Sequence, residues 1–222
     1  MQEIKILMVD DHPMIIEGYQ NTLMATKNED QVLLIDTAGN CDVANNLLQK
    51  AAKNKPYDIC FFDISLPSSS DGKITSGEDL AKITRDIMPN TKIIILTMFN
   101  ESFRIYNIIK EVSPDGFLIK SDLTSMELAE AFQHILKSPP YYSRTVNEYL
   151  KKTITSEVYI DDINRKILHL LSKGIKTRSL REHIDLSMSA IEKRKKQMKL
   201  LFSITDGKDE SLLDEARKKG FL

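Results

Sequence analysis

The sequence predicts an α/β domain built on a parallel β-sheet, followed by a small all-helical domain. In the first 136 residues, short apolar runs alternate with segments of helical periodicity, the pattern of repeated strand-helix-strand units. After Ser138-Pro139-Pro140 no further strand pattern occurs. The charge changes as well, from −7 over residues 1–150 to +6 over residues 151–222. A basic second domain favours a polyanionic partner.

Composition limits the class of protein. The chain has 222 residues, of which 41% are hydrophobic and 28% charged, as in ordinary globular proteins with room for two small domains. No apolar run approaches the roughly 20 residues that span a membrane, and the start Met-Gln-Glu-Ile-Lys does not resemble a signal peptide. We therefore expect a cytoplasmic protein without a membrane partner. Cys41 and Cys60 are the two cysteines, too few for a disulfide framework.

Five strands are expected in the first domain. The run Ile59–Phe62 is almost continuously apolar, which is typical of a central parallel strand covered on both faces. The other runs are shorter or alternate in polarity. The predicted strands are Ile4–Val9, Gln31–Thr37, Tyr57–Asp63, Lys92–Leu96 and Gly116–Ile119.

Helical segments separate these strands. Pro13 suits the first turn of one helix, and Asp42 is the expected cap of the next. Five strands joined by helices predict a doubly wound sheet with helices on both faces, and the flavodoxin-like order 2-1-3-4-5 makes strands 1, 3, 4 and 5 neighbours. The predicted helices are Pro13–Ala25, Asp42–Lys53, Gly77–Met88, Glu101–Val112 and Thr124–Leu136.

Polar residues end four of the strands: Asp10 and Asp11, Asp63, Thr97, and Lys120. In the expected strand order these residues meet at one edge of the sheet, where such folds bind ligands. Three carboxylates in one place repel one another unless a cation joins them, and oxygen ligands suit Mg²⁺. Asp63 is then a nucleophile for phosphorus, with Mg²⁺, Lys120 and Thr97 neutralising the phosphoryl oxygens. An Asp after a strand taken alone is more often a turn residue.

The ordered set Asp10-Asp11-His12-Pro13, Asp63 with Pro67, Leu96-Thr97 and Gly116–Lys120 resembles the receiver domain of two-component response regulators of the LuxR/NarL type. This resemblance implies Mg²⁺-dependent phosphorylation of Asp63 by a sensor histidine kinase. It further implies metal binding by Asp10, Asp11, Asp63 and the Ser65 carbonyl, and a switch pair of Thr97 and Phe117. His12 is a helix-start residue usual in this subfamily. The implied protein is a phosphoacceptor regulator that forms a homodimer on activation, not an enzyme acting on other molecules.

The second domain shows a helix-turn-helix layout. Helices are expected at Ile163–Lys173, Arg178–Ile184, Ser189–Phe202 and Ser211–Lys219, with Ser187 as the cap of the third. On a helical wheel of the third helix, the apolar residues Ile191, Met198, Leu201 and Phe202 share one side. The opposite side is predicted to bind double-stranded DNA through Ser189, Glu192, Lys193, Lys196 and Lys199.

The resemblance extends to this part of the chain, which looks like a LuxR-type domain, although Ala190 and Glu192 stand where Thr and Lys are frequent. The expected division is a receiver domain at 1–137, a linker with a short helix at 138–158 and a helix-turn-helix domain at 159–222. The loop from Pro67 to Gly77 is about six residues longer than usual in the family, and its polar composition predicts mobility.

Two other functions fit part of the pattern. The divergence at Ala190 and Glu192 leaves open a receiver whose tail binds protein rather than DNA. A phosphatase similar to the haloacid dehalogenases also uses a strand-end Asp as nucleophile, but that class expects a second Asp two residues later, where this chain has Ser65.

Overall fold

The computed structural model describes residues 1–98, 102–155 and 160–222. The expected helix start at Glu101 and the end of the expected linker at 158 lie outside these residues. Two compact units divide the chain: residues 1–100 with 107–146, and residues 101–106 with 147–222. The expected domain boundaries stay a prediction.

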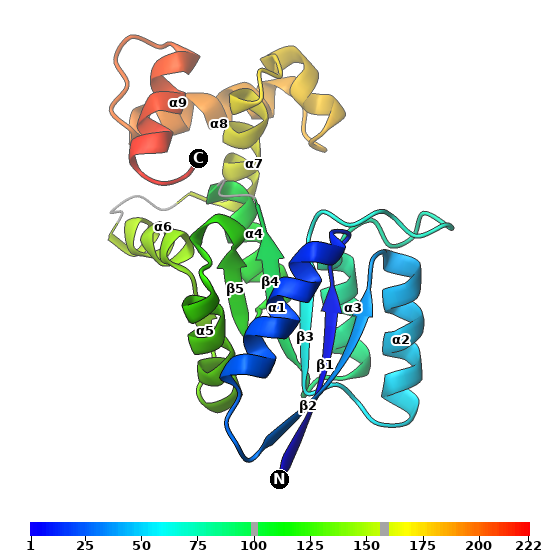
Figure 1. Ribbon diagram of the computed structural model, residues 1–222. Coiled ribbons are helices and arrows are strands. Elements are labelled where there is room, and N and C mark those ends of the chain that lie inside the picture. The colour runs from blue at the N-terminus through cyan, green and yellow to red at the C-terminus, as the bar shows by residue number, and fades with distance from the viewer. Residues whose placement is uncertain (99–101, 156–159) are drawn as a thin grey trace. The chain divides into compact units, whose positions relative to one another are not determined.

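The first unit contains a parallel sheet with the strand order β2-β1-β3-β4-β5-β6 (Figure 1). The order of the first five strands is the predicted one. The expectation of five strands was wrong, because Tyr141–Tyr142 forms a sixth strand beside β5. The strands are β1 (Gln2–Val9), β2 (Gln31–Ala38), β3 (Ile59–Asp63), β4 (Lys92–Thr97), β5 (Gly116–Ile119) and β6 (Tyr141–Tyr142).

Helices cover both faces of this sheet, as the doubly wound pattern predicts (Figure 1). On one face, α1 and α5 enclose a core with the side chains of Ile6, Phe61 and Leu118. The helices α2, α3 and α4 lie on the other face. The elements that follow the strands are α1 (Pro13–Thr26), α2 (Cys41–Lys53), α3 (Gly77–Ile87), α4 (Ser102–Val112), the 3-10 turn η1 (Lys120–Asp122), α5 (Ser125–Lys137) and α6 (Arg144–Thr155).

Side-chain caps fix where the helices begin. Ser76 caps α3, and Thr124 forms a capping box with Glu127 at the start of α5. The cap of α2 is Asn40, whose Oδ1 accepts a hydrogen bond from the Val43 amide, and not Asp42 as expected. Asp42 instead accepts the Ser70 amide at 2.9 Å, so it ties the long loop to α2.

That loop, expected to be mobile, is folded by hydrogen bonds of its own. The Ser69 amide donates to the Ile74 carbonyl at 2.8 Å, the Ser69 hydroxyl donates to Asp71, and the Ile74 side chain is buried. Gly77, which follows the loop, leaves no space for a side chain, since an added Cβ would lie 1.9 Å from the Asp63 carbonyl oxygen. This glycine lets α3 start directly against the end of β3.

Strand β6 is held by a partly buried polar brace, formed by Asp122, Ser143 and Thr145, in what was expected to be linker. Asp122 accepts hydrogen bonds from the Ser143 hydroxyl at 2.7 Å and from the Thr145 amide and hydroxyl at 2.9 Å each. The Ser143 hydroxyl also accepts the Ile119 amide at 3.1 Å. Burial alone would raise the pKa of Asp122, but these hydrogen bonds lower it below its usual value.

The second unit has a helical core of its own. It contains α7 (Asp162–Ser172), the 3-10 segment η2 (Thr177–Glu182), α8 (Met188–Leu201) and α9 (Asp209–Lys218). The segment expected as a short α-helix at Arg178–Ile184 is therefore mostly the 3-10 turns of η2. Ser187 caps α8 as predicted. The packed core includes Ile167, Leu168, Leu180, Ile191, Met198, Leu212 and Phe221.

One side of α8 differs from its helical wheel. Ile191, Met198 and Phe202 are buried as predicted, but Leu201 is 48% exposed and Lys195 takes the remaining inward position. Burial at residues 191, 195, 198 and 202 follows alternate steps of four and three, which turns Leu201 away from the core. Among the described residues, no helix is long and apolar enough to cross a membrane.

Asp122→Asn tests the brace. At neutral pH we expect the substitution to lower the free energy of unfolding by about 2 kcal/mol, because hydrogen bonds to a charged acceptor are lost. The folded pKa of Asp122 is depressed, so its stabilisation is present above the unfolded pKa of about 3.9 and disappears as pH falls through the lower folded value. Denaturation at pH 7 and at low pH checks this; a pH-independent difference would contradict it.

Candidate functional site

The site lies where the carboxyl ends of β1, β3, β4 and β5 meet. Strand register places Val9 beside Phe62, Asp63 beside Leu96, and Thr97 beside Ile119. The residues that follow these positions therefore share one edge, as predicted. Asp10, Asp63 and Thr97 are each at most 2% exposed although all three are polar.

Lys120 joins two of the carboxylates. Its Nζ lies 2.6 Å from Asp10 Oδ2 and 3.0 Å from Asp63 Oδ2, and its side chain is 6% exposed. Two buried carboxylates are costly unless a cation compensates their charges. The ammonium group of Lys120 supplies one such charge at the centre of the site.

One atom of Asp63 stays unpaired. Among the described residues, Asp63 Oδ1 is buried and has no hydrogen-bond partner. Burial raises the pKa of Asp63 above its usual value, and the hydrogen bond and charge of Lys120 oppose that rise without cancelling it. A buried carboxylate oxygen without a partner can bind a further cation or act as a nucleophile.

The electrostatic field of this cluster reaches the neighbouring helix. Burial, together with the charges of Asp10 and Asp63, raises the pKa of Tyr19 in α1 to about 12. The carboxylates of the site therefore add to the effect of burial on the pKa of this tyrosine.

Asp10, Asp11, His12 and Asp63 form a possible metal centre. Each offers one ligand atom, and these atoms all lie within 4.8 Å of one another. Asp11 is partly exposed, which leaves one side of the group open to solvent. Oxygen ligands of this kind, with an unpaired carboxylate oxygen among them, fit a hard divalent ion such as Mg²⁺. The metal ligands predicted from the sequence did not include His12.

The remaining predicted site residues lie around this centre. Ser65 follows β3, and its backbone hydrogen bond to Asp63 lowers the pKa of that carboxyl. Phe117 in β5 is completely buried. The coordination by the Ser65 carbonyl and the switching of Thr97 with Phe117 stay predictions.

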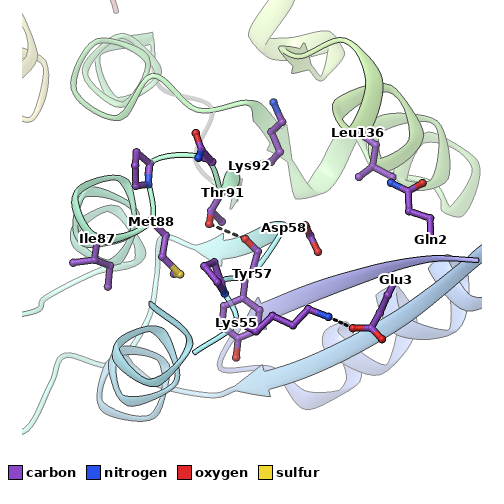
Figure 2. Close-up of a pocket in the computed structure, with 13 residues that line it drawn as sticks. Gln2, Glu3, Lys55, Tyr57, Asp58, Ile87, Met88, Thr91, Lys92 and Leu136 are labelled. Atoms are coloured by element: carbon purple, nitrogen blue, oxygen red, sulfur yellow. Dashed lines mark hydrogen bonds and ion pairs between the residues drawn. The ribbon is translucent and has the colours of Figure 1, made fainter. Parts of the chain in front are cut away.

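A hollow of about 560 Å³ lies at the opposite, amino end of the sheet (Figure 2). Its charged residues largely pair with groups nearby: Lys55 with Glu3, and Lys92 with Asp115. Asp58 accepts the Lys5 amide at 2.7 Å. This hollow therefore lacks the unpaired buried charge that distinguishes the acidic site.

In the second unit, α8 presents the predicted face. Ser189, Glu192, Lys193 and Lys196 are exposed on this helix. Lys199 does not belong to this exposed group, because its Nζ lies 2.6 Å from Asp209 Oδ1 and its side chain is 17% exposed. The Lys199 ammonium also donates to the Gly207 carbonyl. The assignment of Lys199 to DNA binding stays a prediction, and its pairing with Asp209 of α9 is what the sequence did not indicate.

Two other basic residues of α8 serve the fold of the unit. Lys195 is buried and bonds to Thr177 at 2.7 Å and Asp209 at 2.8 Å. Arg194 lies 2.7 Å from Asp161, the cap of α7. Burial alone would raise the pKa of Asp209, but its bonds to Lys195 and Lys199 lower it. Only part of the positive charge of α8 is thus available to a partner.

Comparison with known proteins identifies the family. Residues 6–133 match the response regulator receiver domain. This match covers more than half of the chain, and the chain therefore belongs to the response regulators.

Relatives align over most of the chain. The oxygen regulatory protein NreC of Staphylococcus epidermidis is 24% identical over 232 residues, which cover 99% of this chain and 99% of that protein. NreC of Staphylococcus carnosus is 25% identical over 204 residues, which cover 86% of this chain and 88% of that protein. The second unit is therefore included in the similarity.

Solved structures share the fold. A structure of RcsB dimers bound to two parallel DNAs has a TM-score of 0.63 and 18% identity, covering 97% of this chain and 98% of that chain. A second structure is that of RcsB of Salmonella enterica serovar Typhimurium bound to the promoter P1flhDC in the presence of the phosphomimetic BeF3⁻. It has a TM-score of 0.62 and 19% identity, and the match covers 96% of this chain and 98% of that chain.

Asp63→Asn tests the electrostatics of the site. Because the folded pKa of Asp63 is raised, its ionised form destabilises the fold, and this cost develops as pH rises from the unfolded value of about 3.9 through the folded pKa. Without divalent ions at pH 7, we expect Asp63→Asn to be more stable than the wild type by about 1 to 2 kcal/mol. Urea denaturation in EDTA measures the difference. A less stable variant at pH 7, or a gain that persists unchanged at pH 3, would refute this explanation.

Proposed function

We propose that this protein is a response regulator in which Asp63 accepts a phosphoryl group and thereby controls binding of the second unit to double-stranded DNA. The observation that carries the proposal is the buried Asp63 with one oxygen beside Lys120 and the other unpaired. Membership of the response regulator family supports it.

The chain's own residues have distinct roles in this reaction. Asp63 attacks phosphorus, the bond from phosphorus to the donor breaks, and the donor leaves with the bonding electrons. Lys120 neutralises one phosphoryl oxygen, and the Thr97 hydroxyl donates to another. A Mg²⁺ held by Asp10, Asp11, Asp63 and the Ser65 carbonyl supplies further neutralisation of charge when bound. Transfer to Asp63 and later hydrolysis there are the only chemistry we propose.

The phosphoryl donor is a sensor histidine kinase, as the resemblance implies. A hollow of about 390 Å³ between α1 and α5 leads to Lys120 and gives a surface on which a donor protein can approach the site. Met14 and Met98 line this hollow and are 85% and 66% exposed. Exposed methionines adapt to the shape of a partner.

DNA binding is assigned to the exposed face of α8. Lys193 and Lys196 contact phosphates, while Ser189 and Glu192 are placed to reach base edges, with Glu192 suited to accept from the amino group of cytosine. RcsB, which has the same fold, is bound to DNA as dimers. We infer that this chain also forms a homodimer on activation. The alternative of a protein-binding tail is not favoured, because relatives align through the second unit.

Phosphorylation is tested by the mass of the intact protein after incubation with a small phosphodonor. The wild type should gain one phosphoryl group when Mg²⁺ is present and none in EDTA, and Asp63→Ala should gain none. Ser65→Ala is the control, since its backbone carbonyl is retained. A phosphoryl adduct of normal yield on Asp63→Ala would exclude Asp63 as the acceptor.

DNA binding is tested by the salt dependence of affinity for a DNA fragment selected by the wild type. Lys193→Ala and Lys196→Ala should each weaken binding and lower the slope of log K against log salt by about 0.9, the value for one phosphate contact. Lys218→Ala, on α9, is the matched control for an exposed lysine elsewhere and should leave the slope unchanged. Equal slopes for all four proteins would show that α8 does not contact DNA phosphates through these lysines.

A further inference from the structure

We propose that His12 is a direct ligand of the divalent ion at the acidic site, so that the site takes transition ions that bind imidazole well, such as Ni²⁺, as well as Mg²⁺ and Mn²⁺. The inference rests on the proposed function, because it concerns the same metal centre. It adds a fourth side chain and a chemical preference to the carboxylates.

Geometry places the imidazole among the ligands. His12 Nδ1 lies 2.6 Å from Asp11 Oδ1 and 3.3 Å from Asp10 Oδ1. In an octahedral ion with bonds of about 2.1 Å, neighbouring ligand atoms are about 3.0 Å apart and opposite ones about 4.2 Å apart. The ligand atoms of His12 and the three carboxylates all lie within 4.8 Å of one another. Small side-chain movements therefore suffice for all four to contact one ion.

A second observation indicates where a cation would bind in the cluster. Asp63 is only 2% exposed, and its Oδ1 has no partner within the part of the chain that the structure describes. Lys120 neutralises the opposite side, at Asp63 Oδ2 and Asp10 Oδ2. The side of the cluster that faces Asp11 and His12 is the one that lacks a permanent cation.

Helix capping does not account for the position of His12. The residue precedes α1, but its side chain makes no capping hydrogen bond. Its ring is 64% exposed and turns toward the carboxylates, while its backbone amide is held separately by Asp10 Oδ1 at 3.1 Å. The imidazole can thus be removed without loss of a helix cap or of core packing.

The donor set decides the preference among ions. Mg²⁺ favours oxygen ligands and gains little from imidazole, whereas Ni²⁺ favours imidazole and Mn²⁺ accepts it with a lower affinity, as the Irving–Williams order gives. Loss of His12 should therefore affect Ni²⁺ strongly and Mg²⁺ weakly. A residue that merely supported the fold would change the affinities of both ions alike.

The experiment combines calorimetry with pulsed EPR on the full chain. Mg²⁺ and Ni²⁺ are titrated into the wild type, His12→Ala, Asp63→Asn and the control His183→Ala, which removes an exposed histidine of the second unit. Mn²⁺ complexes of the same proteins are examined for the nitrogen modulation of a directly bound imidazole.

We expect His12→Ala to raise the Kd for Ni²⁺ at least about tenfold, to leave that for Mg²⁺ within about twofold, and to abolish the nitrogen modulation that the wild type and His183→Ala show. Mn²⁺ bound by the wild type without nitrogen modulation, or equal changes for Mg²⁺ and Ni²⁺, would overturn the inference while the receiver function stands. Mg²⁺ binding that is absent, or that is unaffected in Asp63→Asn, would instead overturn the proposed metal site as a whole.

Discussion

The bridge from Lys120 to Asp10 and Asp63 is the interaction on which the site depends. Its distances of 2.6 and 3.0 Å hold two buried carboxylates beside one ammonium group. Without that cation, two negative charges would repel each other in a region where water cannot screen them. With it, the pKa of Asp63 is still raised by burial, so the ionised acid is less stable than in water and a further cation at the site would stabilise it.

The parallel sheet makes this bridge possible. Lys120 and Asp10 are 110 residues apart in the chain, yet the strand order and register bring their strand ends to one edge. Close approach also matters at the backbone: Gly77 lets α3 begin against the Asp63 carbonyl, where a Cβ would be only 1.9 Å away. Any larger residue there would displace either the helix start or the acid itself.

The sequence predicted the sheet and the acidic centre for one physical reason. Parallel strands end at a common edge, so polar residues after apolar runs must gather there, and this reasoning correctly brought Asp10, Asp63 and Lys120 together. Strand β6 was missed because two residues are too few for a periodic pattern and two prolines precede them. Its anchor, Asp122, acts through Ser143 and Thr145, and such tertiary hydrogen bonds leave no signal in spacing.

The same limit explains the errors on α8. A helical wheel places residues by angle and cannot show their partners on other helices, and Lys195 and Lys199 both bind Asp209 of α9. Their aliphatic stems can be covered once a carboxylate pairs with the ammonium group. For His12 the sequence indicated only a residue at a helix start. In the structure its ring turns toward the carboxylates of the site.

The internal pairing of α8 also constrains how phosphorylation can act. Arg194 with Asp161, and Lys195 with Asp209, hold the helix inside a core that the second unit builds by itself. On the function proposed above, a phosphoryl group on Asp63 therefore does not have to fold the DNA-binding helix; it has only to shift the balance between two states of the receiver. A tenfold shift in such an equilibrium requires a difference of only about 1.4 kcal/mol between the two receiver states. Conversion of the buried Asp63 carboxylate into an acyl phosphate adds negative charge beside Lys120 and Asp10, and a change of charge inside a buried site is a source of free energy of that order.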